Sequence, residues 1–452
     1  MTRAARIVVC GAGMAGVAAA YHLAARHRAG GVVLVDPREP LTLTSNKGTE
    51  GYRNWFPGPG PDMVRFMDRS IDLLESLVEE SGGSVRLNRR GYVMLTRDRA
   101  RLDAMGRAAA EIAALGAGPL RRHPGPSPYH PANPVEWGGE PGGADLIDDP
   151  GLVARTWPYV AVDVVGALHV RRAGFFDSWG AGQWMLMRAA RAGVEIRRDE
   201  IVAIDAPGGR VQGVRLASGE SLEAEHVVLA AGPLLPRAAR MLGLELPLFC
   251  ELHAKLALRD TERLLPREAP MLIWNDPVKL EWSADERRAL AADPAAAPLL
   301  GPLPAGVHVR PRERTRELLL IWTYDAAPRE PDWPPRHDPH HGEALIRAAA
   351  HMIPALRAYF SRAAQGVVDG GYYCKTPENR PLVGPLPVEG AWVIGALSGF
   401  GIMGCHAAAD LLASHMLGLP LPDYAPAFAP ARHDDPAYAE RMGAWRGWSG
   451  QL

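Results

Sequence analysis

The feature that most constrains this chain is a glycine-spaced turn between two short apolar runs near its start. Residues 7–16 read IVVCGAGMAG and residues 32–36 read VVLVD. The first run predicts a buried parallel strand, an alanine-rich helix follows over 14–25, and 32–35 predict a second strand. Strand, GxGxxG turn, helix and a second strand ending in an acid form the context in which this fingerprint binds a dinucleotide.

Each glycine of the turn has a separate physical task. The first permits the tight turn, the second lets the backbone approach a pyrophosphate, and the third lets helix and strand pack closely. The start of the helix offers free N–H groups and the positive end of its dipole, and the acid can accept hydrogen bonds from ribose hydroxyls. The alternative is a glycine-rich bend without a ligand. We expect nucleotide contacts from Gly11, Gly13, Met14, Ala15, Gly16 and Asp36.

Composition excludes several classes of function. The 452 residues are too many for one compact core, so we expect two domains. Fifty basic and 51 acidic side chains nearly cancel, which argues against a nucleic-acid or membrane partner. The four cysteines form no CxxC pair, so we expect neither a zinc site nor a disulfide framework, and a cytoplasmic setting. No uninterrupted apolar run is long enough to span a membrane.

Four further segments carry a resemblance to a known family. Residues 227–233 read VVLAAGP and residues 392–404 read WVIGALSGFGIMG, each a strand that enters a turn of small residues. Residues 167–196 precede both of these segments, and the stretch YCKTPENRPLVGPLP at 373–387 lies between them, in the order that the family shows. Together with the N-terminal fingerprint, they resemble the FAD-dependent oxidoreductases of the D-amino-acid-oxidase class, in the branch of glycine oxidase and sarcosine oxidase. The resemblance spans about residues 5–420.

The resemblance implies an α/β fold in which a Rossmann-type FAD-binding domain with a parallel sheet is interleaved with a largely antiparallel α+β substrate domain. It implies FAD as the cofactor. The FAD-binding domain is predicted from 1–60, 150–240 and 365–425, the substrate domain from 61–149 and 241–364, and a C-terminal tail from 426–452.

The resemblance also places most of the remaining cofactor contacts. Residues 44–58, TSNKGTEGYRNWFPG, are expected to wrap the pyrophosphate and the ring, where Lys47 either neutralises a phosphate or stays solvated. Ile201 or Val202 would bring backbone groups to the adenine. The helix that begins in SGFGIMG would aim its N-terminus at the pyrimidine end of the flavin. The expected contacts are Ser45, Lys47, Gly48, Thr49, Glu50, Ile201, Val202, Ala231, Gly232, Gly395, Gly399, Phe400, Gly401, Ile402 and Met403.

Two departures from the family pattern bear on chemistry. The place of the cysteine that carries covalent flavin in sarcosine-oxidase-like enzymes holds Gly371, with Cys374 three residues later, so we expect noncovalent FAD. The lysine that binds a substrate carboxylate in those enzymes is replaced by Met403, and the expected arginine falls near Gly51, two residues before Arg53. A small-amino-acid carboxylate clamp is therefore not visibly kept, which favours a larger or more apolar substrate, or one held by different groups.

Candidate catalytic residues are polar side chains in apolar surroundings or beside the expected ring. We select His253, Tyr373, Arg53 and Lys279, with His308 as a further possible base. Trp274, Trp322 and Tyr324 could line an aromatic pocket that favours an apolar amine, or could be core residues. His337, His340 and His341 lie in a Pro-rich stretch that predicts a surface loop, and we expect no metal site there.

The predicted reaction is oxidation of a C–N bond in an amine or N-substituted amino acid. Hydride would pass from the α-carbon to flavin N5 and leave an imine, while the protein orients the substrate and stabilises the reduced ring. Oxygen or an unidentified carrier would accept the electrons. Three alternatives stay open: oxidation of a hydroxy acid with His253 or His308 as base, oxidation of a bulky secondary-metabolite scaffold, and a non-catalytic flavin-binding subunit.

Overall fold

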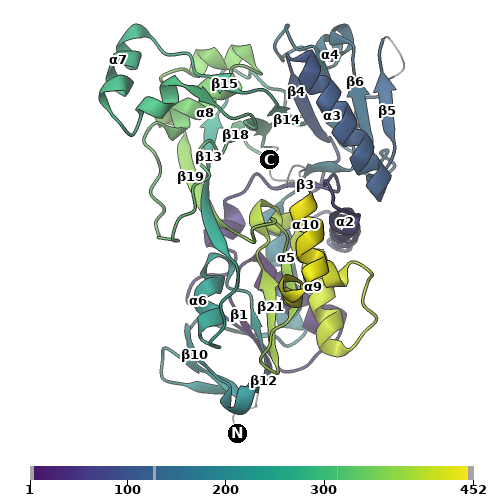
Figure 1. The fold of residues 1–452 in the computed structure, drawn as a ribbon, viewed down its shortest axis with the longest axis vertical. Helices are drawn as coiled ribbons and strands as arrows, with labels where there is room; N and C mark the ends of the chain where they lie inside the picture. Colours follow the sequence, from purple (N-terminus) through teal and green to yellow (C-terminus); the bar gives the residue numbers. More distant parts are fainter. Residues whose placement is uncertain (1–4, 126–128, 313, 446–452) are drawn as a thin grey trace.

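The structure is a computed structural model that describes residues 5–125, 129–312 and 314–445, and it contains two large sheets (Figure 1). The first sheet has a parallel core in the order β21–β12–β1–β2–β9, with β20 antiparallel at one edge and the β10–β11 hairpin extending β12. Its strands are β1 Ala5–Cys10, β2 Val32–Val35, β9 Glu195–Arg197, β10 Ile201–Asp205, β11 Gly213–Leu216, β12 Ser221–Leu229, β20 Leu382–Pro385 and β21 Ala391–Gly395.

Helices cover this sheet because their apolar residues are buried against it. The alanine-rich helix that follows the glycine turn packs between two others, α5 and α9. It does not stay α-helical to its end but widens into a π-helical turn over His22–Arg26. The helices of this half are α1 Met14–Tyr21, α2 Asp62–Glu80, α5 Ser178–Arg191, α6 Leu235–Arg240, α9 Gly401–Leu417 and α10 Pro436–Ala444.

The second sheet has nine strands in the order β19–β13–β18–β17–β14–β4–β7–β6–β5 and is antiparallel except at the β14–β4 and β5–β6 pairs. Its strands are β4 Tyr92–Thr96, β5 Leu120–His123, β6 Ala144–Ile147, β7 Gly166–Val170, β13 Phe249–Arg259, β14 Met271–Trp274, β17 His308–Pro311, β18 Glu317–Ile321 and β19 Val367–Lys375. Around it lie α3 Arg99–Ile112, α4 Pro150–Thr156, α7 Ala284–Ala292 and α8 His341–Ala349. Two small pairs, β3 Gly51–Arg53 with β8 Ala173–Phe175 and β15 Val278–Lys279 with β16 Pro302–Leu303, complete the fold.

The two halves are interleaved along the chain, and their sheets confirm the predicted fold class. Three elements, two strands and one helix, belong to a different half of the fold than the predicted segment boundaries imply. β7 and β19 belong to the second sheet although 150–240 and 365–425 were expected in the FAD-binding domain, and α2 packs on α9 although it begins the expected substrate segment. The long β13–β19 pair thus links the two halves (Figure 1).

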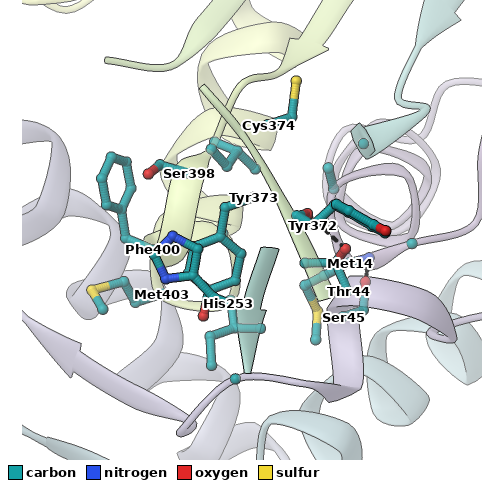
Figure 2. A pocket seen from close by; sticks show the side chains of 18 of the residues that line it. Met14, Thr44, Ser45, His253, Tyr372, Tyr373, Cys374, Ser398, Phe400 and Met403 are labelled. Carbon is teal, nitrogen blue, oxygen red and sulfur yellow. Dashed lines mark hydrogen bonds between the residues drawn. The ribbon is translucent and has the colours of Figure 1, made fainter. Parts of the chain in front are cut away.

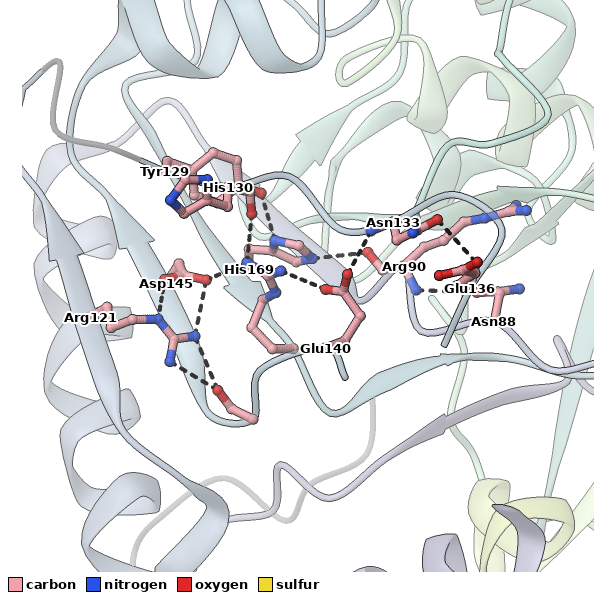
Figure 3. A network of polar contacts seen from close by, with 12 residues as sticks. Asn88, Arg90, Arg121, Tyr129, His130, Asn133, Glu136, Glu140, Asp145 and His169 are labelled. Atoms are coloured by element: carbon pink, nitrogen blue, oxygen red, sulfur yellow. Dashed lines mark hydrogen bonds and ion pairs between the residues drawn. The ribbon is translucent and has the colours of Figure 1, made fainter. Parts of the chain in front are cut away.

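A buried polar network fastens the Pro- and Gly-rich stretch after β5 to the second sheet (Figure 3). The Tyr129 hydroxyl lies 2.7 Å from Nδ1 of His169, whose Nε2 donates to the carbonyl of Arg90 at 2.9 Å. Arg171 pairs with Asp145 and Glu140, both at 2.9 Å. These contacts tie the described part of residues 123–143 to buried groups.

The described part of the C-terminal tail packs against the rest of the protein. The Arg432 side chain is buried and donates to Glu378 at 2.7 Å, and Tyr438 on α10 donates to the same carboxylate at 3.2 Å. Trp445, the last described residue, is half-buried, and Trp448 lies outside the described residues. None of the helices in the described ranges has the length and apolar character needed to cross a membrane.

Candidate active site

A cavity lies where the two sheets meet, and segments from both halves of the chain line it (Figure 2). It encloses about 1390 Å³ of space free of protein atoms, part of it open to solvent. Eighteen of the residues selected from sequence line this one cavity: Gly13, Met14, Ala15, Asp36, Ser45, Gly48, Thr49, Glu50, Arg53, Gly232, His253, Tyr373, Gly395, Gly399, Phe400, Gly401, Ile402 and Met403.

Two glycines of the turn are required by close packing rather than by the cavity. Gly11 has φ +110°, and a Cβ there would lie 2.6 Å from the carbonyl oxygen of Ala230 on the neighbouring strand. A Cβ on Gly16 would lie 1.8 Å from the carbonyl oxygen of Gly11. Any side chain at these positions would push α1 away from β1 and β12, so both glycines set where the helix begins.

The N-terminus of α1 opens into the cavity. Gly13 is the N-cap and makes no side-chain cap hydrogen bond of its own. The Met14 amide donates to Oγ of Ser45 at 2.9 Å, and the Ala12 amide donates to Oδ2 of Asp36 at 2.8 Å. Asp36 and Ser45 therefore stand beside the helix start, where backbone donors and the helix dipole favour an anionic group.

Contacts from the second sheet hold the loop of residues 42–50 over the cavity. Lys255 donates to the carbonyls of Asn46 and Gly48 at 3.2 and 3.1 Å, and burial lowers the pKa of Lys255 to about 8. Arg310 pairs with Glu50. Lys47 does not line the cavity, because its Nζ lies 2.7 Å from Oδ2 of Asp369.

A second helix N-terminus faces the same cavity. Residues 398–400 form a 3-10 turn that leads into α9, and Phe400 is the N-cap with no side-chain cap hydrogen bond. Two helix starts thus meet one cavity, the first beside Asp36 and Ser45. The start of α1 suits a pyrophosphate, and the start of α9 suits the negative charge that develops on a reduced flavin ring. The residues present therefore fit FAD.

His253 stands in the cavity wall with both ring nitrogens engaged. Nε2 lies 3.0 Å from a carboxylate oxygen of Glu251, which can only accept, so Nε2 carries the proton and Nδ1 accepts from the Thr323 hydroxyl at 2.7 Å. Burial lowers the pKa of His253 although Glu251 raises it. Its ring stacks on Tyr373 with centroids 4.0 Å apart (Figure 2). Lys375 neutralises Glu251 at 2.5 Å. These two hydrogen bonds occupy both ring nitrogens, so neither is available to a substrate.

Arg53, Tyr92 and His308 line the cavity from β3, β4 and β17. The Arg53 side chain is 4% exposed, its guanidinium lies 4.4 Å from the centre of the Phe56 ring, and Nε donates to the carbonyl of Trp55. Nδ1 of His308 donates to the carbonyl of Gly306 at 3.0 Å, which leaves Nε2 as the unprotonated nitrogen. Burial, together with the nearby Arg53 charge, lowers the pKa of His308 to about 4.

Several residues selected from sequence lie elsewhere. Lys279 is exposed on the β15–β16 pair, so it does not face the cavity. Val202 is 46% exposed on β10, and neither it nor Ile201 lines the cavity. Ala231 lies between two lining residues without lining it. Of the two alternatives for the aromatic residues, the structure supports core packing: Trp274 and Trp322 are buried in the core of the second half, and Tyr324 packs against it. None of the three lines the cavity.

Other cavity residues were missed because no local pattern marks them. Tyr92, Met271, Ile321 and Thr323 come from strands β4, β14 and β18 or the residues just after them, whose sequences read as ordinary buried strands. They meet only because the nine-stranded sheet brings these three strands together. Residues 337–341, which hold three histidines, form no cluster of metal-ligand spacing in the part of the chain that is described.

Comparison with known proteins agrees with this geometry. The family model of FAD dependent oxidoreductases (DAO) matches residues 6–415. A D-amino acid dehydrogenase of Methylobacterium nodulans is 28% identical over 299 residues, which cover 54% of this chain and 64% of that protein. The chain thus matches less than two thirds of that relative's length.

Two solved structures share the fold over nearly their whole length. An L-proline dehydrogenase from P. horikoshii has a TM-score of 0.72 at 18% identity and covers 96% of this chain and 99% of its own. A glycine oxidase from Geobacillus kaustophilus has a TM-score of 0.70 at 17% identity, and the match covers 94% of this chain and 98% of the oxidase chain. With the family match across most of the chain and a cavity that fits the cofactor, this protein belongs to the FAD dependent oxidoreductase (DAO) family.

Proposed function

We propose that this enzyme oxidises the C–N bond of an amino acid or N-substituted amino acid. The observation that carries the proposal is the buried Arg53 guanidinium in the wall of the same cavity as the α9 helix start. A guanidinium pairs well with a carboxylate in a fork of two hydrogen bonds. The names of the relatives support an amino-acid substrate, since those proteins are amino acid or proline dehydrogenases and a glycine oxidase.

Bound FAD would supply the hydride acceptor for oxidation of the substrate at its α-carbon to an imine. The chain's own residues orient the substrate for this step. Arg53 holds the carboxylate, and the apolar side chains of Met271, Ile321 and Phe400 exclude water. The α9 helix start stabilises negative charge at the ring.

The state of the two cavity histidines favours an amine over a hydroxy acid. A hydroxy acid needs a base for its hydroxyl proton, whereas a neutral amine supplies its own lone pair. His253 has both nitrogens engaged. His308 is left with a pKa of about 4, which makes it a weak proton acceptor near neutral pH.

The test is anaerobic mixing of the FAD-loaded enzyme with a panel of D- and L-amino acids, N-methyl amino acids and 2-hydroxy acids. We expect amino acids to bleach the flavin absorbance and the hydroxy acids to leave it unchanged. Bleaching by hydroxy acids alone would overturn the proposal and make His308 the base to test. Flavin that no donor reduces would favour a non-catalytic subunit. Admission of air after reduction separates an oxidase from a dehydrogenase.

We also propose that the FAD is noncovalent. Cys374 lines the cavity from β19, but its thiol neighbours that of Cys250 on β13. A hydrogen bond with Cys250, together with burial, raises the pKa of Cys374, and a thiol without thiolate character is a poor nucleophile. Acid precipitation of the wild type should release yellow colour to the supernatant, and Cys374→Ser should purify with the same flavin content. Colour retained in the wild-type pellet and lost in that variant would identify a covalent link.

A further inference from the structure

The π-helical turn at the end of α1 brings two histidines together on the side of the molecule away from the glycine turn. The His27 amide donates to the carbonyl of His22 at 3.0 Å, which closes a ring five residues apart instead of the four of an α-helix. An α-helix would place residues five apart on different faces. The wider turn sets both imidazoles on the face that packs against α9.

The α9 helix supplies a carboxylate at the same place. Oδ1 of Asp410 lies 3.7 Å from Nδ1 of His22 and 4.0 Å from Nε2 of His27, and the three ligand atoms all lie within 4.8 Å of one another. A point equidistant from atoms with these separations lies about 2.4 Å from each. Inward shifts of a few tenths of an ångström would give the 2.0–2.2 Å bonds that imidazole and carboxylate make to Zn²⁺.

The buried member of this group has an unused nitrogen. His22 is 1% exposed, and its Nδ1 is buried with no hydrogen-bond partner among the described residues. A buried unpaired nitrogen costs free energy, and a metal bond would remove that cost.

The surroundings orient the carboxylate and leave a path for an ion. Arg69 donates from Nε to Oδ2 of Asp410 at 2.9 Å, so Oδ1 is the oxygen turned to the histidines. Side chains of His27 and Asp410 are 26% and 20% exposed, which keeps the site open to water as a fourth ligand. Arg26, the remaining nearby cation on the turn, pairs with Glu80 at 3.0 Å.

We propose that His22, His27 and Asp410 form a binding site for a divalent transition-metal ion of the Zn²⁺ type. Two imidazoles and one carboxylate are the donor set that Zn²⁺ accepts with an open fourth position. The ion would join the turn at the C-terminal end of α1 to the middle of α9. Its role would be to fix the two helices whose N-termini line the cofactor cavity. The inference does not depend on the proposed reaction.

The experiment is calorimetric titration of ZnCl₂ into the tag-free, FAD-loaded enzyme after dialysis against a chelator. We expect one ion per chain with micromolar or tighter affinity. His27→Ala and Asp410→Asn should each weaken binding by about tenfold or more. Both side chains are partly exposed, so the variants should fold. A Zn²⁺-dependent rise of the unfolding temperature should appear in the wild type and be lost in both variants.

His415→Ala is the matched control, because this histidine also lies on α9 with a buried, unpaired Nε2 but is not part of the cluster. It should bind Zn²⁺ like the wild type. The proposal is overturned if the wild type binds no stoichiometric ion, if His27→Ala and Asp410→Asn bind as tightly as the wild type, or if His415→Ala loses binding to the same degree.

Discussion

Arg53 is the side chain on which recognition of a substrate carboxylate depends in the proposed reaction. Arg53→Met removes the charge, and Arg53→Lys keeps the charge without the planar fork. A charge-assisted hydrogen bond contributes about 1.5–3 kcal/mol, so KM for an amino acid should rise about 10- to 100-fold in Arg53→Met, with a smaller change in kcat. Steady-state kinetics of both variants measure this split.

The control is the amine that corresponds to the best substrate without its carboxylate. Wild type and Arg53→Met should oxidise that amine with equal kcat/KM, because Arg53 has no carboxylate to hold. Equal losses on the amino acid and on the amine would show that Arg53 supports the cavity instead of binding the carboxylate.

At the scale of elements, the β1–α1 turn should tolerate no side chain at Gly16. The added Cβ of Gly16→Ala would lie 1.8 Å from the Gly11 carbonyl oxygen, so the helix start must move out of the cavity wall. We expect the purified variant to lose most of its FAD, read as flavin absorbance per protein. Gly30→Ala is the control, because nothing lies within 4 Å of its Cβ. Full flavin content in Gly16→Ala would contradict this account of the turn.

The docked tail depends on the Glu378 carboxylate, which Arg432, His433 and Tyr438 contact at 2.7, 2.9 and 3.2 Å. Burial raises the pKa of Glu378, but His433 and Arg432 outweigh it and lower the pKa to about 2. The folded pKa is thus below the unfolded value of about 4.5. The ionised carboxylate therefore stabilises the fold above pH 4.5, and this stability is lost as pH falls toward 2.

Glu378→Gln should lower the free energy of unfolding by about 2–3 kcal/mol at pH 7, because it leaves the buried Arg432 charge without its partner. The difference from the wild type should shrink as pH is lowered from 5 toward 2. Urea unfolding at several pH values measures it, and the exposed Glu440→Gln on α10 is the control. A difference that stays constant across this pH range would refute the assignment to the carboxylate charge.

At the scale of the whole molecule, the cofactor cavity is lined from both sheets, so bound FAD joins the two halves. Ligand at 100 times its Kd stabilises the folded state by about 2.7 kcal/mol. For a chain of this length we expect removal of FAD to lower Tm by about 3–5 °C, with recovery when FAD is added back. Scanning fluorimetry of the apo and reconstituted enzyme tests this. An unchanged Tm would mean that the two halves hold together without the cofactor.

The sequence by itself determined the β1–α1–β2 unit and the second glycine turn before α9, and its resemblance to the family implied the fold class. The first two features are local, because a GxGxxG turn meets its strand and helix within about 30 residues. The positive φ of Gly11 and the clash that a Cβ on Gly16 would make with the Gly11 carbonyl both arise inside the turn. Buried β-branched runs likewise predict strands wherever the sheet places them. The glycine turn located Gly13, Met14, Ala15 and Asp36 in the cavity wall, whereas the resemblance to the family placed most of the other predicted residues that line it.

Only the tertiary structure decided what the polar residues do. His253 is unavailable as a base because Thr323, 70 residues later, occupies its second nitrogen, and Lys279 is exposed because its short strand pairs away from the cavity. His22 and His27 meet Asp410 only through a π-turn and the packing of α1 on α9. Hydrogen bonds between distant segments depend on strand order and register, and a single sequence carries no local signal for either.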